Sequence, residues 1–264
     1  MAKTTSILSL AGAALAFSVA GAAAADLPVK APMMAPIQAF DWSGYYAGVG
    51  IGGQWSDFDW VYVNGATPNP RTQSRDRAVY ELHGGAQYQF GGLGWGGLVV
   101  GYEYSGTFDM DSHGTDGAVC PNVAFNCQVK MESLFTIGGK LGLAWDRFML
   151  YGQGGWAGAY VRTNGVVPAT GVIFEQTKQW HNGWYVGGGL DYAFYHTAGT
   201  DWIIGVDYKH VELDTVYHQV TPGNVTILDR NITPTSDQLL ARLTVKFQGP
   251  LWPFASAAPV AARY

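Results

Sequence analysis

Acidic and basic side chains recur at alternate positions of segments whose other positions are apolar. If such a segment is an extended strand, its charges share one face, and in a closed sheet they meet across the interior. An unpaired charge there costs several kcal/mol, so charges of both signs should pair and fill the interior. Asp207 and Arg242 should form one pair, because they lie equally far from the aromatic residues that end two neighbouring segments. The predicted charge network comprises Glu81, Glu103, Glu132, Lys140, Asp191, Asp207, Lys209 and Arg242.

Two cysteines, Cys120 and Cys127, lie close together in a stretch rich in Gly, Asp, Asn and Pro. In an oxidising compartment they should form a disulfide. The closed ring is short, so the bond would stabilise the fold by roughly 2.5 kcal/mol at most, enough to tie down a loop tip. A zinc site is the alternative, and it is disfavoured because the sequence supplies no second cysteine pair and no clustered histidines.

Other motifs carry no chemistry in this context. Gly48, Gly50 and Gly53 match a dinucleotide fingerprint in spacing alone, since they lie inside an expected strand rather than between a strand and a helix. Aspartates in a loop near residue 109 lack the spacing and the closing glutamate of a helix-loop-helix calcium site. The six histidines fall one to a segment or loop and form no cluster. We therefore expect no enzyme, no cofactor and no metal site.

The first residues resemble an export signal. Lys3 precedes an apolar, small-residue run over 7–22, and Ala23 and Ala25 form a small-x-small cleavage pattern before Asp26. Cleavage is expected between Ala25 and Asp26. A membrane-anchoring helix is the alternative, and the dominance of Ala and Gly makes it the weaker one.

Composition points to a protein in contact with lipid. Charged residues make up only 13% of the chain, about half of the ~25% usual in soluble domains, while aromatics reach 14%. Beyond the signal the sequence has no apolar run of ~18 residues, so a closed β-barrel is the expected way to span a bilayer. The net charge of −5 and the absence of a basic stripe argue against nucleic acid as a partner.

Segments of alternating polarity supply the strands of that barrel. The connections between them alternate in length, with long ones at 56–77, 109–128, 162–178 and 212–237, as in outer-membrane barrels with short periplasmic turns and long outer loops. Trp42, Trp95, Trp145, Trp202 and Phe247 should form an aromatic ring at the periplasmic lipid interface. Lys130 and Lys246 are also assigned to inward positions. The expected fold is an all-β, eight-stranded antiparallel up-and-down transmembrane β-barrel with strands over 42–55, 78–90, 95–108, 129–143, 148–161, 179–194, 202–213 and 238–247.

Several short runs together resemble a known family. They are FDWSGYYAG at 40–48, LYGQGG at 150–155, GGGLDY at 187–192 and VDY at 206–208. Together they look like the small immunogenic outer-membrane proteins of alphaproteobacteria, which are porin-like, opacity-type barrels. The resemblance implies eight strands, surface-exposed antigenic loops and a role in envelope integrity; some relatives are described as porins or haem binders. The family usually ends at the aromatic residue of its last strand, here Phe247, whereas this chain continues.

The expected organisation is a signal peptide over 1–25, a Pro/Ala-rich periplasmic linker over 26–41, the barrel over 42–247 and a Pro-rich tail over 248–264. The expected function is a structural, surface-exposed component of the cell outer membrane. A porin for small solutes, and loop-mediated ligand (haem) binding or adhesion, are the alternatives. A soluble lipocalin-like barrel would place its apolar residues inside, the reverse of this pattern. Expected partners are outer-membrane lipid and the barrel-assembly machinery, and homo-oligomerisation stays open.

Overall fold

A computed structural model of the chain describes residues 40–63, 70–91, 97–110, 115–117, 126–197, 199–219 and 229–247. All of them belong to one compact unit, 39–264. The predicted signal, its cleavage site at Ala25 and Asp26, most of the linker, and the tail lie outside the described residues. Within the described part, the chain has no helix with the length and apolarity needed to cross a membrane.

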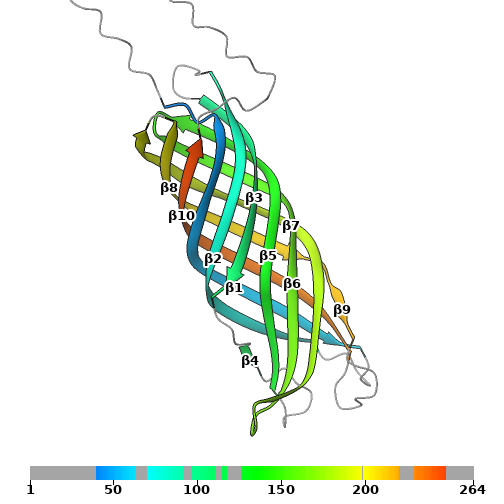
Figure 1. Ribbon diagram of the computed structural model, residues 1–264. Coiled ribbons are helices and arrows are strands. Elements are labelled where there is room, and N and C mark those ends of the chain that lie inside the picture. Colours follow the sequence, from blue (N-terminus) through cyan, green and yellow to red (C-terminus); the bar gives the residue numbers. More distant parts are fainter. Residues whose placement is uncertain are drawn as a thin grey trace, which may run out of the picture. The chain divides into compact units, whose positions relative to one another are not determined.

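Eight long antiparallel strands form a closed ring (Figure 1). Each strand pairs with its neighbours along the ring, and the first strand also pairs with the last, from Tyr45 opposite Phe247 to Tyr62 opposite Arg230. Two short strands lie outside the ring: β4 (Thr115–Gly117) pairs with β5, and β9 (Val216–His218) pairs with β10. The ring runs through β1 (Gly44–Tyr62), β2 (Pro70–Phe90), β3 (Gly97–Asp109), β5 (Asn126–Trp145), β6 (Phe148–Val167), β7 (Val172–Thr197), β8 (Thr200–Leu213) and β10 (Arg230–Phe247).

An apolar band covers the outer face of the ring. On β1 it comprises Tyr45, Val49, Ile51 and Trp55, whose side chains are 42% to 56% exposed. The band extends from Tyr45 to Trp55 on this strand, which matches the ~9–11 residues that a tilted strand needs to cross a bilayer. Alternation of outward apolar and inward polar residues therefore confirms the predicted transmembrane barrel.

The strands continue well past this band at one end of the barrel. β7, for example, is 26 residues long. The prediction of long loops is therefore wrong in part. The ranges 56–77, 162–178 and 212–237 contain the projecting ends of β1, β2, β6, β7 and β10. Outer-membrane barrels carry their long connections outside the cell. We call the projecting strand segments the extracellular extension; they are 56–62, 70–79, 126–134, 161–167, 172–182, 216–218 and 230–238.

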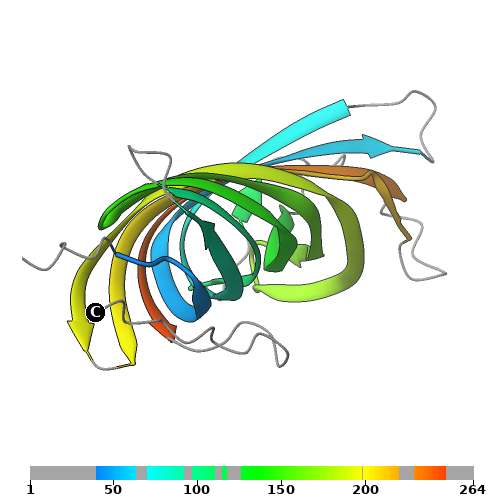
Figure 2. The same ribbon diagram turned by 90° about the horizontal axis from the view of Figure 1, so that it is seen from above.

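Within the extension the ring divides into two sheets. β3 ends opposite Val79 and β8 ends opposite Gly183. Above these points neither strand bridges its neighbours any longer, so the ring opens into two separate sheets. One sheet contains β2, β1, β10 and β9, and the other contains β4, β5, β6 and β7. Figure 2 shows the far ends of β1, β2 and β10 running together along one side. Two packed sheets can bury an apolar core between their inner faces, as a β-sandwich does.

A β-bulge on β5 reverses the predicted alternation of that strand. The register with β6 shifts between Met131 and Ser133. Below the bulge the inward residues are as expected, but above it Met131 points inward and is 5% exposed. Lys130 and Glu132, predicted to face the lumen, therefore lie on the outer side. A bulge adds one residue to one strand, so it exchanges the two faces of the remaining segment.

Candidate functional site

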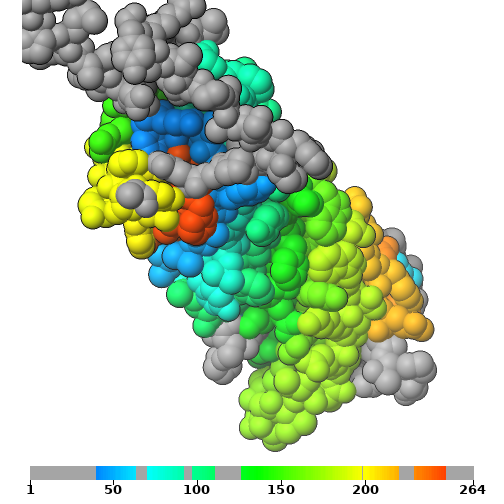
Figure 3. Space-filling view, turned by 45° about the horizontal axis from the view of Figure 1, so that its top comes forward, coloured from blue at the N-terminus to red at the C-terminus, as the bar shows by residue number. Residues whose placement is uncertain are grey.

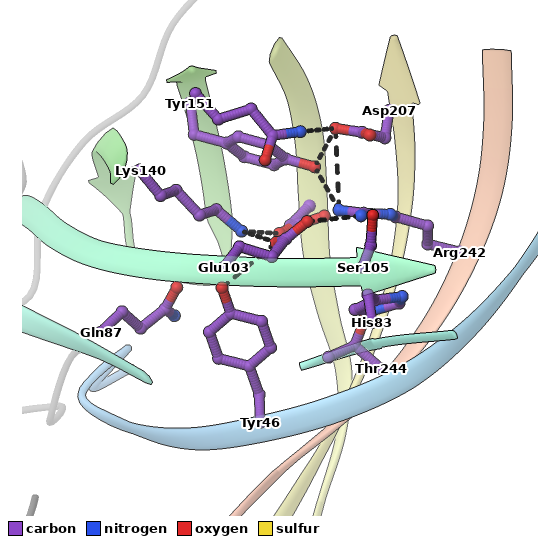
Figure 4. Close-up of polar contacts among 12 residues, drawn as sticks. Tyr46, His83, Gln87, Glu103, Ser105, Lys140, Tyr151, Asp207, Arg242 and Thr244 are labelled. Carbon is purple, nitrogen blue, oxygen red and sulfur yellow. Dashed lines mark hydrogen bonds and ion pairs between the residues drawn. The ribbon is translucent and has the colours of Figure 1, made fainter. Parts of the chain in front are cut away.

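Arg242 on β10 lies at the centre of the charge network in the lumen (Figure 4). Its Nε donates to Oε1 of Glu81 at 2.8 Å, and its Nη2 donates to Oε1 of Glu103 at 2.5 Å. These carboxylates come from β2 and β3, so one guanidinium joins three strands across the barrel. Planar guanidinium groups suit this role because they donate several fixed hydrogen bonds at once.

Two lysines supply the other cations of the network. Lys209 Nζ donates to Oε2 of Glu81 at 2.5 Å and to Oγ of Ser105 at 2.8 Å. Lys140 Nζ lies 3.4 Å from Oδ2 of Asp191 and 3.6 Å from Oε2 of Glu103. Three cations therefore face four carboxylates of the predicted set, and all seven residues are buried.

Asp207 lies in the network, but its shortest contacts are with neutral groups. Its Oδ1 accepts from the Tyr151 hydroxyl at 2.9 Å and from Nε2 of Gln153 at 2.7 Å. The predicted partner, Arg242, approaches the same oxygen to 3.7 Å. Tyr151 and Gln153 were not anticipated, because their chemistry is common and only their position across the lumen makes them partners of Asp207.

Seven of the eight predicted network residues thus lie together, and Glu132 does not. It pairs with two cations on the outer surface, Arg162 at 2.5 Å and Lys178 at 2.7 Å. His83 is an unpredicted neighbour of the network, with Nδ1 3.2 Å from Oε1 of Glu81 and Nε2 2.8 Å from Oγ1 of Thr244. The cavity that remains among these residues is about 10 Å³, roughly the room of one water molecule.

An apolar cluster closes the lumen below the charges, at the end with the short turns. Trp42 is fully buried there, which corrects its predicted place in the outer aromatic ring. Its Nε1 donates to the carbonyl of Asp146 at 2.9 Å, and its backbone N–H donates to Oε1 of Gln89 at 2.8 Å. Trp145, Trp202 and Phe247 do face outward, and Trp95 lies outside the described residues. This lower plug comprises Trp42, Val99, Ala144, Met149, Tyr151, Ala193 and Ile203.

Lys246, predicted to face inward, ties the chain before β1 to the lower plug. Its Nζ forms an ion pair with Oδ2 of Asp201 at 3.0 Å and contacts the carbonyl of Asp41. The same ammonium lies 4.6 Å from the ring centre of Phe40. These contacts hold the segment that carries Trp42 across the opening of the barrel.

A second apolar cluster closes the lumen above the charges and continues into the extracellular extension. Residues from both sheets contribute to it, and on β1 they include Phe58, Trp60 and Tyr62, which are at most 2% exposed. These three positions were predicted to be loop. The upper core comprises Phe58, Trp60, Tyr62, Cys127, Val129, Met131, Leu134, Ala157, Ala159, Val161, Tyr185, Val211, Leu213 and Ile232.

Buried polar contacts cross-link the two sheets beside the upper core. Nη2 of Arg230 on β10 donates to Oε1 of Glu175 on β7 at 2.7 Å and to Oγ1 of Thr163 on β6 at 2.8 Å. The guanidinium also lies 4.9 Å from the ring centre of Trp60. Burial raises the pKa of Glu175, and the charge of Arg230 opposes this rise.

Two histidines meet in the extension, contrary to the prediction that none cluster. Nε2 of His181 on β7 lies 3.0 Å from Nε2 of His218 on β9, and Nδ1 of His181 lies 3.0 Å from the carbonyl oxygen of Asp214. Burial, and then the nearby His181 and Arg230, lower the pKa of His218 to about 3. Within the part of the chain that the structure describes, three or more His, Cys, Asp or Glu residues do not gather as a metal site.

Cys127, one member of the predicted disulfide, is disulfide-bonded. Cys127 is buried in the upper core, and Cys120 lies outside the described residues.

Comparison with known proteins agrees with this architecture. Residues 10–247 match the family described as outer membrane protein beta-barrel domain. The chain belongs to this family. It is 25% identical to the 31 kDa outer-membrane immunogenic proteins of Brucella melitensis and Brucella suis, over 73% of this chain and 81% of theirs. Among solved structures, it is similar to the outer-membrane protease OmpT from Escherichia coli at 11% identity, covering 77% of this chain and 97% of that one with a TM-score of 0.44.

The family and the immunogenic relatives establish the setting. The protein is an outer-membrane β-barrel in contact with lipid and a component of the cell envelope surface. This confirms the predicted resemblance, fold and location.

Proposed function

We propose that this member of the outer-membrane β-barrel family is a non-conducting, non-enzymatic scaffold that displays its extracellular extension on the cell surface. The observation that carries the proposal is the layered filling of its interior. The charge network occupies the middle of the barrel, the lower plug lies beneath it and the upper core above it. An eight-stranded barrel has an interior that side chains just fill.

This filling disfavours the porin alternative. An ion would have to cross two close-packed apolar layers, where burying an unpaired charge costs several kcal/mol. It would also have to disrupt the ion pairs that Arg242 and Lys209 form with Glu81. The same rigid interior gives the extension a stable base, which suits display of the connections at its tip.

Several earlier expectations belong to this proposal. Residues 1–25 are a cleaved signal peptide, 26–41 are a periplasmic linker and 248–264 are a periplasmic tail. Cys120 and Cys127 are joined near the displayed tip. The barrel-assembly machinery inserts the protein, and nucleic acid is not a partner. Adhesion or ligand capture would then be a property of the connections at the tip rather than of the lumen, and self-association would occur through the outer surface.

Planar-bilayer recording of the refolded mature protein tests the proposal. The gel shift between boiled and unboiled samples verifies folding of the same preparation, and a conducting porin reconstituted in parallel verifies the bilayer. We expect a heat-modifiable band without stable current steps. Reproducible steps that scale with the amount of heat-modifiable protein would contradict the scaffold and support a porin.

A further inference from the structure

The hairpin formed by β6 and β7 ends in an exposed turn within the extracellular extension. Its strands pair as far as Val167 opposite Val172, whereas β5 pairs with β6 only as far as Asn126 opposite Val166. Figure 1 shows the hairpin, in yellow-green, at the lower end of the view, and Figure 3 shows the same end as a convex projection. Every residue from 168 to 173 is exposed. We call these residues the apolar tip.

The apolar tip carries no charge. The sequence from 163 to 174 contains no acidic or basic residue. Glu175 is the next charged residue on β7, but its side chain is buried and pairs with Arg230 inside the extension. Val172 and Ile173 are 56% and 52% exposed, and adjacent residues of a strand point to opposite faces. Both faces of the tip therefore present apolar side chains to the solvent.

Backbone N–H groups of the tip are bonded within the hairpin. Those of Thr170 and Gly171 both donate to the carbonyl oxygen of Val167, at 3.2 and 2.8 Å. The N–H of Val172 donates to Oγ1 of Thr170 at 3.4 Å, and Pro168 has no N–H. Gly171 has a φ of +67°, which suits glycine in this tight turn. Such a turn can enter an apolar medium, where unbonded backbone groups would be costly.

Polar residues behind the tip set the depth to which it can enter lipid. Asn164 on β6 lies opposite Gln176 on β7, and Phe174 is the last apolar residue before them on β7. From Phe174 to Gly171 the strand covers about 10 Å at ~3.3 Å per residue. Interfacial apolar segments enter the boundary between headgroups and acyl chains to a depth of ~5–10 Å. The polar pair would then lie at the level of the headgroups.

We propose that the apolar tip inserts into the surface of a phospholipid bilayer that faces the cell. Its small size favours lipid over a protein or a second copy of the chain. A stable protein interface uses ~20–30 residues on each side, whereas the tip is a single short turn over 168–173. Lipid can close around a narrow convex group without a matching surface. The inference rests on the proposed display function, since only an outward-facing extension can reach such a bilayer.

Flotation of the refolded mature protein with protein-free vesicles tests the proposal. The barrel is held in a lipid nanodisc, which leaves the extension in water, and is mixed with larger phosphatidylcholine vesicles. We expect the protein to float with the vesicles while empty nanodiscs stay below. Because the tip is uncharged, raising the salt concentration should change binding by less than about twofold.

Substitutions in the tip test which residues carry the binding. Val172→Ser combined with Ile173→Ser should weaken vesicle binding about tenfold or more, because removal of apolar surface from water drives insertion. Ala169→Trp should strengthen binding, since indole rings favour the lipid interface. Val63→Ser is the matched control, because Val63 is 43% exposed directly after β1 and lies away from the tip. It should leave binding unchanged, and each variant must retain the heat-dependent gel shift.

Two outcomes would overturn the proposal. One is vesicle binding that the combined substitution of Val172 and Ile173 does not change. The other is binding to vesicles that contain membrane proteins but not to protein-free vesicles, which would indicate a protein partner. The scaffold function is tested separately by planar-bilayer recording, so a barrel that neither conducts nor floats would retain that function and lose the role of its tip.

Discussion

The guanidinium group of Arg242 donates to carboxylates on two other strands and is almost fully buried. Arg242→Ala would leave Glu81 and Glu103 without this partner inside the lumen. Removing one member of a buried ion pair costs about 3–5 kcal/mol. We therefore expect a clear fall in the temperature at which the folded gel band converts to the unfolded one.

Arg162→Ala is the matched control for this loss. Its guanidinium also pairs with a glutamate, but the side chain is 35% exposed on the outer surface. Exposed ion pairs contribute about 0–1 kcal/mol, so this variant should melt close to the wild type. Equal melting of Arg242→Ala and wild type would mean that the lumen network does not stabilise the barrel.

His218 should make the extracellular extension sensitive to acid. Its folded pKa of about 3 lies below the unfolded value of about 6.5. Between these values the unfolded state binds more protons, so the stabilising effect of neutral His218 is complete above about pH 6.5 and is lost as pH falls towards 3. The neighbouring groups in this interior are His181, Arg230 and Glu175.

The measurement is thermal melting of wild type and His218→Phe at pH 7.5 and pH 5. The phenylalanine variant loses the contact between the rings but cannot titrate, so its melting temperature should change less between the two pH values. If both proteins lose the same number of degrees, protonation of His218 does not control the stability of the extension.

At the scale of elements, β1 performs two tasks along one strand. In the membrane three successive inward positions are glycine, at Gly48, Gly50 and Gly52, and at Gly48 a Cβ would come within 2.7 Å of two ring atoms of His83. In the extension its inward positions are Phe58, Trp60 and Tyr62. The first half leaves space for the charge network, and the second half supplies apolar volume to a sandwich of two sheets.

Trp60→Ala should therefore loosen the extension while the membrane barrel persists. Replacing a fully buried large aromatic residue by alanine costs about 3–5 kcal/mol. We expect new sites of limited proteolysis in the extension, with the heat-dependent gel shift retained. Trp55→Ala, on the lipid-facing side of the same strand, is the control and should not increase cleavage there. Unchanged protease resistance of Trp60→Ala would contradict the role of the upper core.

At the scale of the whole molecule, three layers follow one another along the interior. Apolar packing dominates in the lower plug and the upper core, whereas ion pairs and hydrogen bonds dominate in the charge network between them. Ion pairs in the middle are shielded from water by apolar packing above and below, which strengthens their attraction. The outer surface contributes in another way, since its apolar band contacts lipid.

Local patterning alone determined the membrane part of the barrel. Alternation of residues such as Tyr45, Val49 and Ile51 with small inward neighbours identifies a lipid-facing strand, because side chains on a strand alternate between faces. The same alternation placed Glu81, Glu103 and Arg242 on the inner face. The sequence predicts which side chains belong to the network, because the sign of a charge and the face of a strand are local properties. It does not predict which of these side chains pair, because the distance between two side chains across the lumen depends on the closed barrel.

Tertiary structure decided what local patterning could not. The bulge on β5 moved Glu132 outward, because one extra residue exchanges the faces of a strand without leaving a mark in composition. In the sequence, Phe58 and Trp60 lie among polar neighbours typical of a loop. Their side chains are buried only because a second sheet packs against the face of β1 that carries them. His181 and His218 are far apart in the chain, so their contact exists only where β7 and β9 meet. Trp42 became a plug rather than part of the outer ring, because contacts with Asp146 and Gln89 turn its segment across the opening of the barrel.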